Sequence, residues 1–492
     1  MTSLRRSGLI LAIDGGSQST KVTIFDSTGV VQGQGRAPLR PSALGAGGSV
    51  VHPDDDLWDS LCAAIRRALG DAAVAGDAID ALGLCSIRYC RAMLDETGAL
   101  AEPVLSWMDD RVSAPVRDLD PKVATIASAA GYLTVRLTGQ RRDSAAAYKG
   151  MWPIAEDGLS WSEVDEDFAS TGMPRRLLPE LVPPAGLLGE VTAAAAEATG
   201  LAQGCPVFAT ANDKAVEALG AGLSAATDAA SGGQVVLLSL GTYIASTTSG
   251  DRASLHPAAN GPDTWVNSAS VPGDVLYESK GIRRGMWTVT WLRNLVSSSG
   301  NNDPIATQAW LEHGASTLPP GAEGLFVVPD FLAGPDGPDR RGSILGLAGQ
   351  HGAHHLHRAV LEGIALTMRA HAFAMIEALG IESARVVVTG GGAVSDLMMQ
   401  IVADSWGVKA TRAGMPDAAG LGAAICAAVG AGTHPDFPTA IEVMVSQGRE
   451  FAPDPSEVAA YRGIAARYDS LTGFTDPMYR HLAATQSGAV QP

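Results

Sequence analysis

The chain has 492 residues, of which 46% are hydrophobic, and its 35 basic and 52 acidic side chains give a net charge of −17. This length exceeds one compact core, so we expect two large domains, and the acidic balance disfavours nucleic acid, whose phosphates require a basic face. The N-terminal segment does not have the pattern of a signal peptide, no apolar run reaches about 20 residues and no CxxC pair occurs, so we expect a cytoplasmic protein.

The first half of the chain reads as alternating strands and helices. The predicted strands are residues 8–14 (GLILAID), 21–26 (KVTIFD), 79–86, 91–95 and 206–210, and the predicted helix covers residues 54–70. A polar turn, residues 15–20 (GGSQST), joins the first two strands. Asn212 and Asp213 follow the last strand and precede a helical pattern. The alternation indicates an α/β fold in which helices cover mixed sheets.

The second half repeats this opening plan. Its predicted strands are residues 235–240, 243–248 and 385–389, and its predicted helices cover residues 353–379, a segment from near Ser395, and residues 417–430. Gly241-Thr242 is the turn between the first two strands. Strand, small-residue turn and strand therefore open both halves, which indicates two distant structural copies. Small residues at 222–234 predict a hinge, and the segment after about residue 475 predicts a frayed tail.

The first turn, Asp14 to Lys21, has the composition of a phosphate site. Gly15 and Gly16 allow backbone N–H groups to approach a phosphate, and neighbouring hydroxyl groups and Lys21 add donors and charge. Asp14 ends a buried strand and is suited to hold Mg²⁺ directly or through water. An ordinary Gly-Ser turn remains the alternative.

Two further glycine turns carry weaker signals. Gly241-Thr242, with Ser239 and Tyr243, resembles the first turn, and a phosphate chain between the two would be held from both sides. The segment 390–393 (GGGA) lies between a strand and a helix, where a flat ligand can lie on the backbone near a helix N-terminus. Neither GxGxxG nor GxxxxGK[ST] occurs, so Rossmann and Walker-type sites lack their fingerprints. A tight packing turn is the alternative at 390–393.

Asp213 is the candidate general base, because an aspartate between a strand and a helix is well placed to accept a proton from a hydroxyl. A helix N-cap is the alternative role for Asp213. Lys214 is a candidate for a salt bridge or a ligand contact, and as a cation beside Asp213 it would lower the pKa of that carboxyl. The histidines at 351, 354, 355 and 357 lack an HExxH pattern, which favours a solvated helix start over a metal site.

In order along the chain, these motifs resemble those of the FGGY carbohydrate kinases, which share the ATPase core of actin. IDGGSQSTKVTIFD and SLGTY are similar to the two phosphate motifs of the family, and ANDKAVEALGAG to its catalytic-base motif. RRGSILGLAGQHGAHHLHRAVLEGIALTMR resembles the C-terminal signature, and VVVTGGGAVSDLMMQIVADSWG with DAAGLGAA resembles the adenosine motif. The resemblance implies two actin-like (ribonuclease H-like) domains around an interdomain cleft: a sugar- and phosphate-binding domain at 1–230, an adenosine-binding domain at 231–475 and a tail at 476–492.

The resemblance also implies transfer of the ATP γ-phosphate to a substrate hydroxyl, with Mg²⁺ as the metal. It implies that Asp213 is the catalytic base and that Asp14 is the metal-binding residue. The residues it assigns to ATP are Gly15, Gly16, Ser17, Gln18, Ser19, Lys21, Gly241, Thr242, Gly391, Gly392, Ala393 and Asp396. The residues it assigns to the substrate are Arg88, Tyr89, Trp107, Asp213 and Lys214.

The substrate is expected to be a small sugar or polyol, with a pentulose such as D-xylulose favoured. Arg88 matches the glycerol kinases at one position of a recognition pair, whereas Tyr89 matches neither these nor the xylulokinases. Glycerol, tetritols and pentitols are therefore alternatives, as is a catalytically silent ATP- or sugar-binding homologue. Segment 112–130 is shorter than the family pattern, which predicts a more open pocket, a different substrate or a loss of activity. Family members are commonly dimers, so a homodimer is one expected state.

Overall fold

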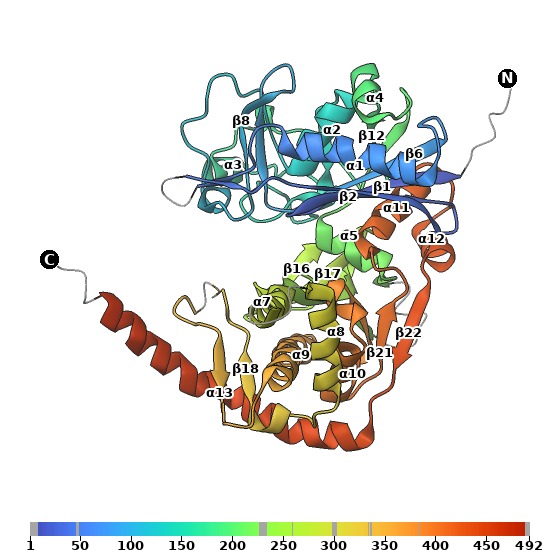
Figure 1. Cartoon of the computed structure of the whole chain (residues 1–492). Coiled ribbons are helices and arrows are strands. Elements are labelled where there is room, and N and C mark those ends of the chain that lie inside the picture. The colour runs from blue at the N-terminus through green and yellow to red at the C-terminus, as the bar shows by residue number, and fades with distance from the viewer. Residues whose placement is uncertain are drawn as a thin grey trace.

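The computed structural model of the chain describes residues 8–45, 49–225, 234–257, 259–297, 303–332, 334, 337–381 and 383–487. Two α/β halves lie one above the other (Figure 1), each built around a central mixed sheet. The α/β prediction is therefore confirmed. Most of the predicted hinge, residues 226–233, lies outside the described residues.

The N-terminal half contains a six-stranded sheet in the order β12-β13-β6-β1-β2-β3. The strands are β1 (Leu9–Gly15), β2 (Ser19–Phe25), β3 (Val31–Pro38), β6 (Ile79–Ser86), β12 (Leu187–Glu190) and β13 (Pro206–Ala209). Strands β1, β2 and β3 are antiparallel neighbours, whereas β6 runs parallel to both β1 and β13. Helix α1 (Asp56–Ala72) covers β2 and β3, and its backbone approaches so closely that a Cβ at Gly35 would lie 2.0 Å from the Ala64 carbonyl oxygen.

The C-terminal half contains a seven-stranded sheet in the order β16-β17-β15-β14-β20-β21-β22. The strands are β14 (Gln234–Leu240), β15 (Ile244–Asp251), β16 (Thr264–Ser268), β17 (Asp274–Ser279), β20 (Ser383–Thr389), β21 (Ala410–Ala413) and β22 (Gln447–Phe451). Here too an antiparallel pair, β14 and β15, opens the half, and β20 runs parallel to both β14 and β21. The predicted repetition of one strand plan is confirmed.

Smaller elements surround the two sheets. In the N-terminal half they are β4 (Ala43–Leu44), β5 (Val50–Val51), β7 (Arg91–Leu94), β8 (Leu100–Leu105), β9 (Thr125–Ala127), β10 (Arg142–Ser144), β11 (Glu180–Val182), α2 (Ala129–Thr138), α3 (Asp165–Thr171) and α4 (Ala193–Thr199). In the C-terminal half they are β18 (Phe326–Val328), β19 (Ser343–Leu345), α7 (Gly285–Ser297), α8 (Pro304–Ser316), α9 (Ala353–Ala378) and α10 (Asp396–Trp406).

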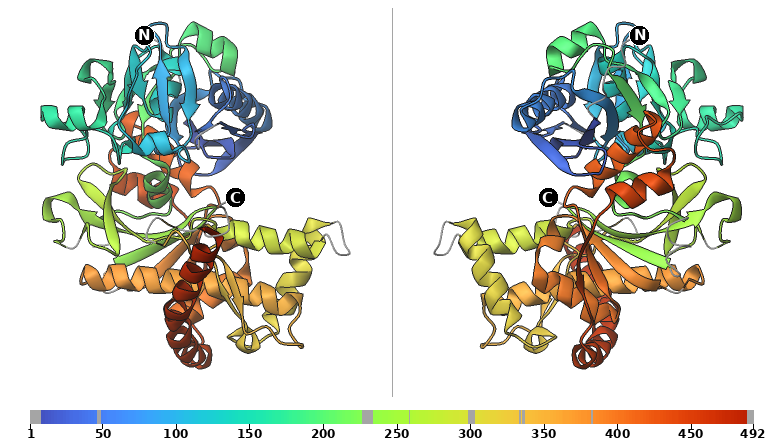
Figure 2. Two further views of the ribbon diagram at one scale, coloured as in Figure 1. Left: turned by 90° about the vertical axis from the view of Figure 1, so that its left-hand side faces the viewer. Right: turned by 90° about the vertical axis from the view of Figure 1, so that its right-hand side faces the viewer.

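Two helices pack against each other where the halves meet. Helix α5 (Asp213–Gly220) and helix α11 (Ala418–Gly430) approach so closely that a Cβ at Gly220 would lie 1.8 Å from the Ala418 carbonyl oxygen. Although α11 lies late in the chain, it packs on β1 and β6, and both views in Figure 2 show it with the N-terminal half. The C-terminal part of the chain thus returns to complete the core under the first sheet.

Helix α12 (Phe437–Met444) follows α11 and also contacts the N-terminal half, because a Cβ at Gly29 would lie 2.3 Å from the Met444 carbonyl oxygen. Residues 418–444 therefore pack with the first half although their sequence position assigns them to the second domain. The spatial division of the chain is consequently not a single cut near residue 230.

In the C-terminal region, the prediction of a frayed tail is wrong and the prediction of a solvated helix start is only partly right. Helix α13 (Pro455–Ser487) continues through Pro477, so residues 476–487 form a helix rather than a frayed tail. The start of α9 is only partly solvated, because His357 is fully buried and its Nε2 lies 3.2 Å from a carboxylate oxygen of Glu312. Among the residues that the structure describes, no cluster of three potential metal ligands occurs.

Helix α9 is the one described helix whose length and composition would allow it to cross a membrane. Within its most apolar window, 61% of the residues are buried inside the protein. This burial is typical of a core helix. The partners that bury it include α8, α10 and strand β18.

Candidate active site

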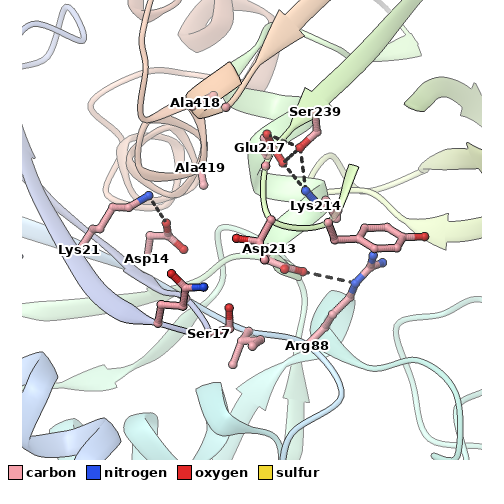
Figure 3. A pocket seen from close by; sticks show the side chains of 18 of the residues that line it. Asp14, Ser17, Lys21, Arg88, Asp213, Lys214, Glu217, Ser239, Ala418 and Ala419 are labelled. Carbon is pink, nitrogen blue, oxygen red and sulfur yellow. Dashed lines mark hydrogen bonds and ion pairs between the residues drawn. The ribbon is translucent and has the colours of Figure 1, made fainter. Parts of the chain in front are cut away.

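A cavity of about 650 Å³ lies between the two halves, and its lining side chains come from both (Figure 3). Among the predicted site residues, the following line it: Asp14, Gly16, Ser17, Gln18, Ser19, Lys21, Arg88, Tyr89, Trp107, Asp213, Lys214, Gly241, Thr242 and Gly391. Residues almost 400 positions apart in the chain therefore meet in one space. Gly15, Gly392, Ala393 and Asp396 are not among the lining residues.

The first wall of the cavity is the loop of residues 16–18, which joins β1 to β2. Asp14, at the end of β1, is buried, and Lys21 Nζ lies 3.5 Å from its Oδ2. Burial raises the pKa of Asp14 to about 6, with Asp417 and Asp213 adding to the rise and Lys21 opposing it. Lys21 alone therefore does not supply enough positive charge to stabilise the ionised form of Asp14.

The residues around Asp14 fit a divalent cation. Asp417, which immediately precedes α11, places a carboxylate beside Asp14, and its buried Oδ1 accepts no hydrogen bond although Lys21 Nζ lies 3.8 Å away. Thr23 donates to the other oxygen of Asp417 at 2.9 Å. Mg²⁺ prefers such carboxylate oxygens, often through water. The unsatisfied oxygen and the raised pKa of Asp14 are both expected where a cation is to bind.

The opposite wall is the loop of residues 241–243, which joins β14 to β15. Ser239 lies one residue before the end of β14, and its hydroxyl lies 2.8 Å from Lys214 Nζ and within 2.9 Å of both oxygens of Glu217. Thr389 Oγ1 donates to Glu217 at 2.7 Å. Burial acts to raise the pKa of Glu217, but Lys214 and these hydroxyl groups outweigh it and hold the pKa below its usual value.

Asp213 is the first residue of α5 and does not cap that helix. The cap is Asn212, whose side-chain oxygen accepts a hydrogen bond from the Ala215 N–H at 3.1 Å. The alternative role of Asp213 as the N-cap is therefore wrong. Its side chain is 31% exposed and lies in the cavity between the two loops (Figure 3), with Oδ1 3.5 Å from Arg88 Nε.

Lys214 lies differently from the expectation that it would act as a cation on Asp213. Its ammonium group lies 2.9 Å from Glu217 Oε2 and 2.8 Å from Ser239, on the side of the second loop (Figure 3). Glu217 therefore neutralises most of its charge. The cation that directly pairs with Asp213 is Arg88.

Arg88, Tyr89 and Trp107 also line the cavity. Both terminal nitrogens of Arg88 donate to Glu278 in β17, each at 3.1 Å. Tyr89 has a φ of +68°, a left-handed conformation that is strained for a bulky side chain and costs about 1–3 kcal/mol. Such strain is concentrated at functional sites, where it fixes the direction of a side chain.

The glycine-rich turn after β20 reaches the cavity through Gly390 and Gly391. Gly392 is packed so tightly that a Cβ would lie 2.7 Å from Met286 Sδ and 2.8 Å from Leu240 Cβ. Asp396, at the start of α10, forms ion pairs with Arg412 and Arg449 at the surface. Gly392 and Asp396, which were predicted to bind ATP, thus have structural roles: Gly392 allows tight packing and Asp396 forms surface ion pairs.

Sequence reasoning missed three carboxylates of the site: Glu217, Glu278 and Asp417. Glu217 lies three residues after Lys214 in a helical pattern, which was a usable signal for a pair. Asp417 belongs to the small-residue segment already noted at 417–430, directly before a helix. Glu278 had no local signal, because its partner Arg88 lies 190 positions away.

Comparisons with known proteins agree with this architecture. Residues 9–124 match the N-terminal domain, and residues 236–431 the C-terminal domain, of the FGGY family of carbohydrate kinases. The chain is 39% identical over 475 residues to the uncharacterized sugar kinase YgcE of Escherichia coli (strain K12), which covers 95% of this chain and 94% of the relative.

Two solved structures with a similar fold are a xylulose kinase from Rhodospirillum rubrum and a gluconate kinase from Lactobacillus acidophilus. The first has a TM-score of 0.77 at 23% identity and covers 96% of this chain and 100% of its own. The second has a TM-score of 0.79 at 18% identity and covers 96% and 99%. From its two matching domains and its fold, the chain belongs to the FGGY family of carbohydrate kinases.

Proposed function

We propose that this carbohydrate kinase transfers the γ-phosphate of ATP to a hydroxyl group of a small sugar or polyol, with Asp213 as the general base. The observation that supports this most strongly is the position of Asp213. Its carboxylate is not used to cap α5, and it lies in a cavity with a phosphate-type loop on each side. A base must come within hydrogen-bond reach of the hydroxyl that it deprotonates, and this location permits that.

The two loops would hold the phosphate chain from opposite sides. The backbone at Gly16 and Gly241 and the hydroxyl groups of Ser17 and Thr242 supply donors there without a side chain that blocks close approach. Lys21 adds a positive charge at the first loop. Catalysis of phosphoryl transfer is mostly a matter of positioning and charge stabilisation, and these groups provide both.

Asp14, with Asp417 beside it, would hold Mg²⁺, either directly or through water. When bound, Mg²⁺ would neutralise the charge of the phosphate oxygens. In the absence of a cation, burial holds the pKa of Asp14 near 6, so part of the carboxyl population is protonated at slightly acidic pH. Competition with the proton would therefore weaken cation binding at Asp14 as the pH falls below about 6.

The proposed substrate is a pentulose such as D-xylulose, with glycerol, tetritols and pentitols as alternatives. Trp107 and Tyr89 offer flat apolar faces, while Asp213 and Glu278 offer acceptors for hydroxyl groups. The fold alone does not select the substrate, since one neighbour of the same fold acts on xylulose and another on gluconate. We propose a cytoplasmic enzyme, consistent with five buried, unpaired cysteines.

A coupled ADP-release screen tests this proposal. The purified chain is supplied with ATP and Mg²⁺ and with pentuloses, hexuloses, tetritols, pentitols or glycerol. ADP release that depends on one class of these compounds supports the kinase, whereas no release with any compound supports a silent binding protein. Release that is independent of the added compound would instead indicate an ATPase.

A further inference from the structure

A buried ion pair joins the two halves beside Asp213, in the part of the cavity that we assign to the sugar and call the sugar end. Arg88 follows β6 of the N-terminal sheet, and Glu278 lies in β17 of the C-terminal sheet. Arg88 Nη1 donates to Glu278 Oε2 and Nη2 donates to Oε1, each at 3.1 Å. Glu278 is fully buried, and its side chain is 1% exposed. Paired two-point contact of this kind is the strongest geometry available to a guanidinium and a carboxylate.

Every nitrogen of the Arg88 guanidinium faces a carboxylate. The two terminal nitrogens are occupied by Glu278, and Nε lies 3.5 Å from Asp213 Oδ1. Glu278 is held in turn by Asn267, whose amide donates to Oε2. Burial acts to raise the pKa of Glu278, but Arg88 outweighs it and keeps the pKa low, so the pair is ionised. The charge of Arg88 is thus already balanced.

Other cations near the pair are held by other groups. Lys214 interacts electrostatically with both Asp213 and Glu278, but its ammonium group lies 2.9 Å from Glu217 Oε2 and donates to Ser239. Lys149 approaches from the N-terminal half, but its ammonium group donates to the backbone carbonyl of Val266. Lys21 lies in β2 and Arg36 in β3, next to the first loop, and Arg283 belongs to the segment after β17. Among these cations, Arg88 is the one whose charged group forms an ion pair with Asp213.

This arrangement distinguishes neutral from anionic sugars. A sugar carboxylate that approached Asp213 would meet two carboxylates, and it would have to displace Glu278 to reach Arg88. A neutral polyol carries no charge and therefore meets no such repulsion. Its hydroxyl groups can also donate hydrogen bonds to Asp213 and Glu278. In a buried site the repulsion between like charges is screened only weakly by solvent.

We propose that Glu278 is a positioning residue that determines specificity: by occupying Arg88, it makes the sugar end of the cavity select neutral polyhydroxy compounds over sugar acids. This inference rests on the proposed function, because it assigns this end of the cavity to the sugar. It narrows the substrate class to uncharged sugars and polyols. It also makes the C-terminal half a contributor to sugar recognition.

The test compares xylitol with D-xylonate, which differ only in the replacement of a terminal CH₂OH by a carboxylate. Affinities are measured by isothermal titration calorimetry without ATP, for the wild type, Glu278→Gln and Glu278→Asp. The wild type is expected to prefer xylitol. In Glu278→Gln, Arg88 loses its counter-charge, and the xylonate-to-xylitol affinity ratio is expected to rise about tenfold or more, the value of one charge-assisted hydrogen bond.

Glu278→Asp is the second variant in case Glu278→Gln does not fold. It keeps the negative charge but is one methylene shorter, so it cannot span both terminal nitrogens of Arg88, and a smaller rise in the ratio is expected. Glu180→Gln is the matched control, because Glu180 forms a 3.0 Å ion pair with Arg142 that is exposed and outside the cavity. That control is expected to leave the ratio unchanged.

An unchanged ratio in the folded Glu278 variants, or a wild type that prefers xylonate, would overturn the inference. Because binding is read without ATP, this outcome is separable from failure of the proposed function. A chain that releases ADP with a sugar but shows an unchanged ratio refutes only the role of Glu278. A chain that shows the expected ratio but releases no ADP refutes only the kinase proposal.

Discussion

The two loops that face each other across the cavity share a strand plan but differ in chemistry. Residues 16–18 and 241–243 each join an antiparallel pair that opens a half. The strands around the first loop carry Asp14 and Lys21, whereas the corresponding end of β14 carries Ser239. The repeated backbone thus supplies two similar cradles, and the side chains assign charge to one of them and neutral donors to the other.

This difference shows how a repeated fold acquires an asymmetric site. The N-terminal half contributes Asp14, the carboxylate proposed to bind the cation, together with the candidate base and Arg88, while the C-terminal half contributes hydroxyl groups and Glu278. The following predictions test whether the charged half carries the chemistry and the second half positions the ligands.

Asp213→Asn is expected to have the largest effect. Asparagine keeps the shape of the side chain but cannot take the proton, so kcat should fall by about 10²–10⁴-fold while the fold is retained. Asp59→Asn is the matched control, because Asp59 also lies in the first turn of a helix, α1, but is exposed and does not line the cavity. Sugar-dependent ADP release measures both, and equal activity of the two variants would refute the role of Asp213.

Asp14→Asn is expected to lower activity and to raise stability. We expect kcat to fall about 10²-fold, as the cation site loses a ligand. The pKa of Asp14 in the folded protein, about 6, exceeds the ordinary value of 3.8, so the folded state binds the proton more tightly than the unfolded state. The protonated carboxyl therefore contributes its full stabilisation below pH 3.8, and this stabilisation is lost as the pH rises through 6.

The neutral variant should consequently be more stable than the wild type by about 1–3 kcal/mol at pH 7.5, and by much less at pH 4.5. Urea unfolding without divalent cations measures this difference. A wild type that is the more stable protein at pH 7.5 would contradict the assignment of Asp14 as an under-compensated buried carboxylate.

Lys214→Met is expected to have a large effect on stability and little effect on the ionisation of Asp213. It leaves Glu217 buried without its cation, which is expected to reduce the free energy of unfolding by about 3–5 kcal/mol. The double variant Lys214→Met/Glu217→Gln should recover most of that loss. The acid limb of the pH–activity profile is expected to stay in place, and a clear shift would mean that Lys214 acts on Asp213 after all.

The smallest expected effects are those of single hydroxyl groups in the two loops. Ser17→Ala and Thr242→Ala each remove one donor to a phosphate oxygen, so the KM for ATP should rise about three- to tenfold in each. Comparable rises of the KM for ATP in both variants would support the proposal that both loops hold the same phosphate chain. A rise in only one variant would indicate that the other loop is a structural turn.

Much of the fold was predictable because its signals are local. Buried strands, the small-residue turns between them and the helix from residue 417 each appear in short sequence windows. The packing of α11 under the N-terminal sheet was not predictable, because it depends on a contact between Gly220 and Ala418 that no local pattern records. The helix through Pro477 also contradicts a local rule that treats proline as a terminator.

The site residues also divide into those with a local sequence signal and those without one. Sequence reasoning found Asp14, Asp213 and the two loops, since each stands at the end of a strand. It left open whether Asp213 is the base or the helix N-cap, and the structure gives the cap to the preceding residue, Asn212. Glu278 escaped notice because a glutamate in a strand resembles a surface residue until Arg88 is placed opposite it.

The most direct test of the central claim is a crystal structure with Mg²⁺, an unhydrolysable ATP analogue and the best substrate from the screen. We expect the terminal phosphate between residues 16–18 and 241–243, with a substrate hydroxyl about 2.6–3.2 Å from the Asp213 carboxylate and directed at that phosphate. Phosphates bound outside both loops, or a hydroxyl turned away from Asp213, would contradict the account.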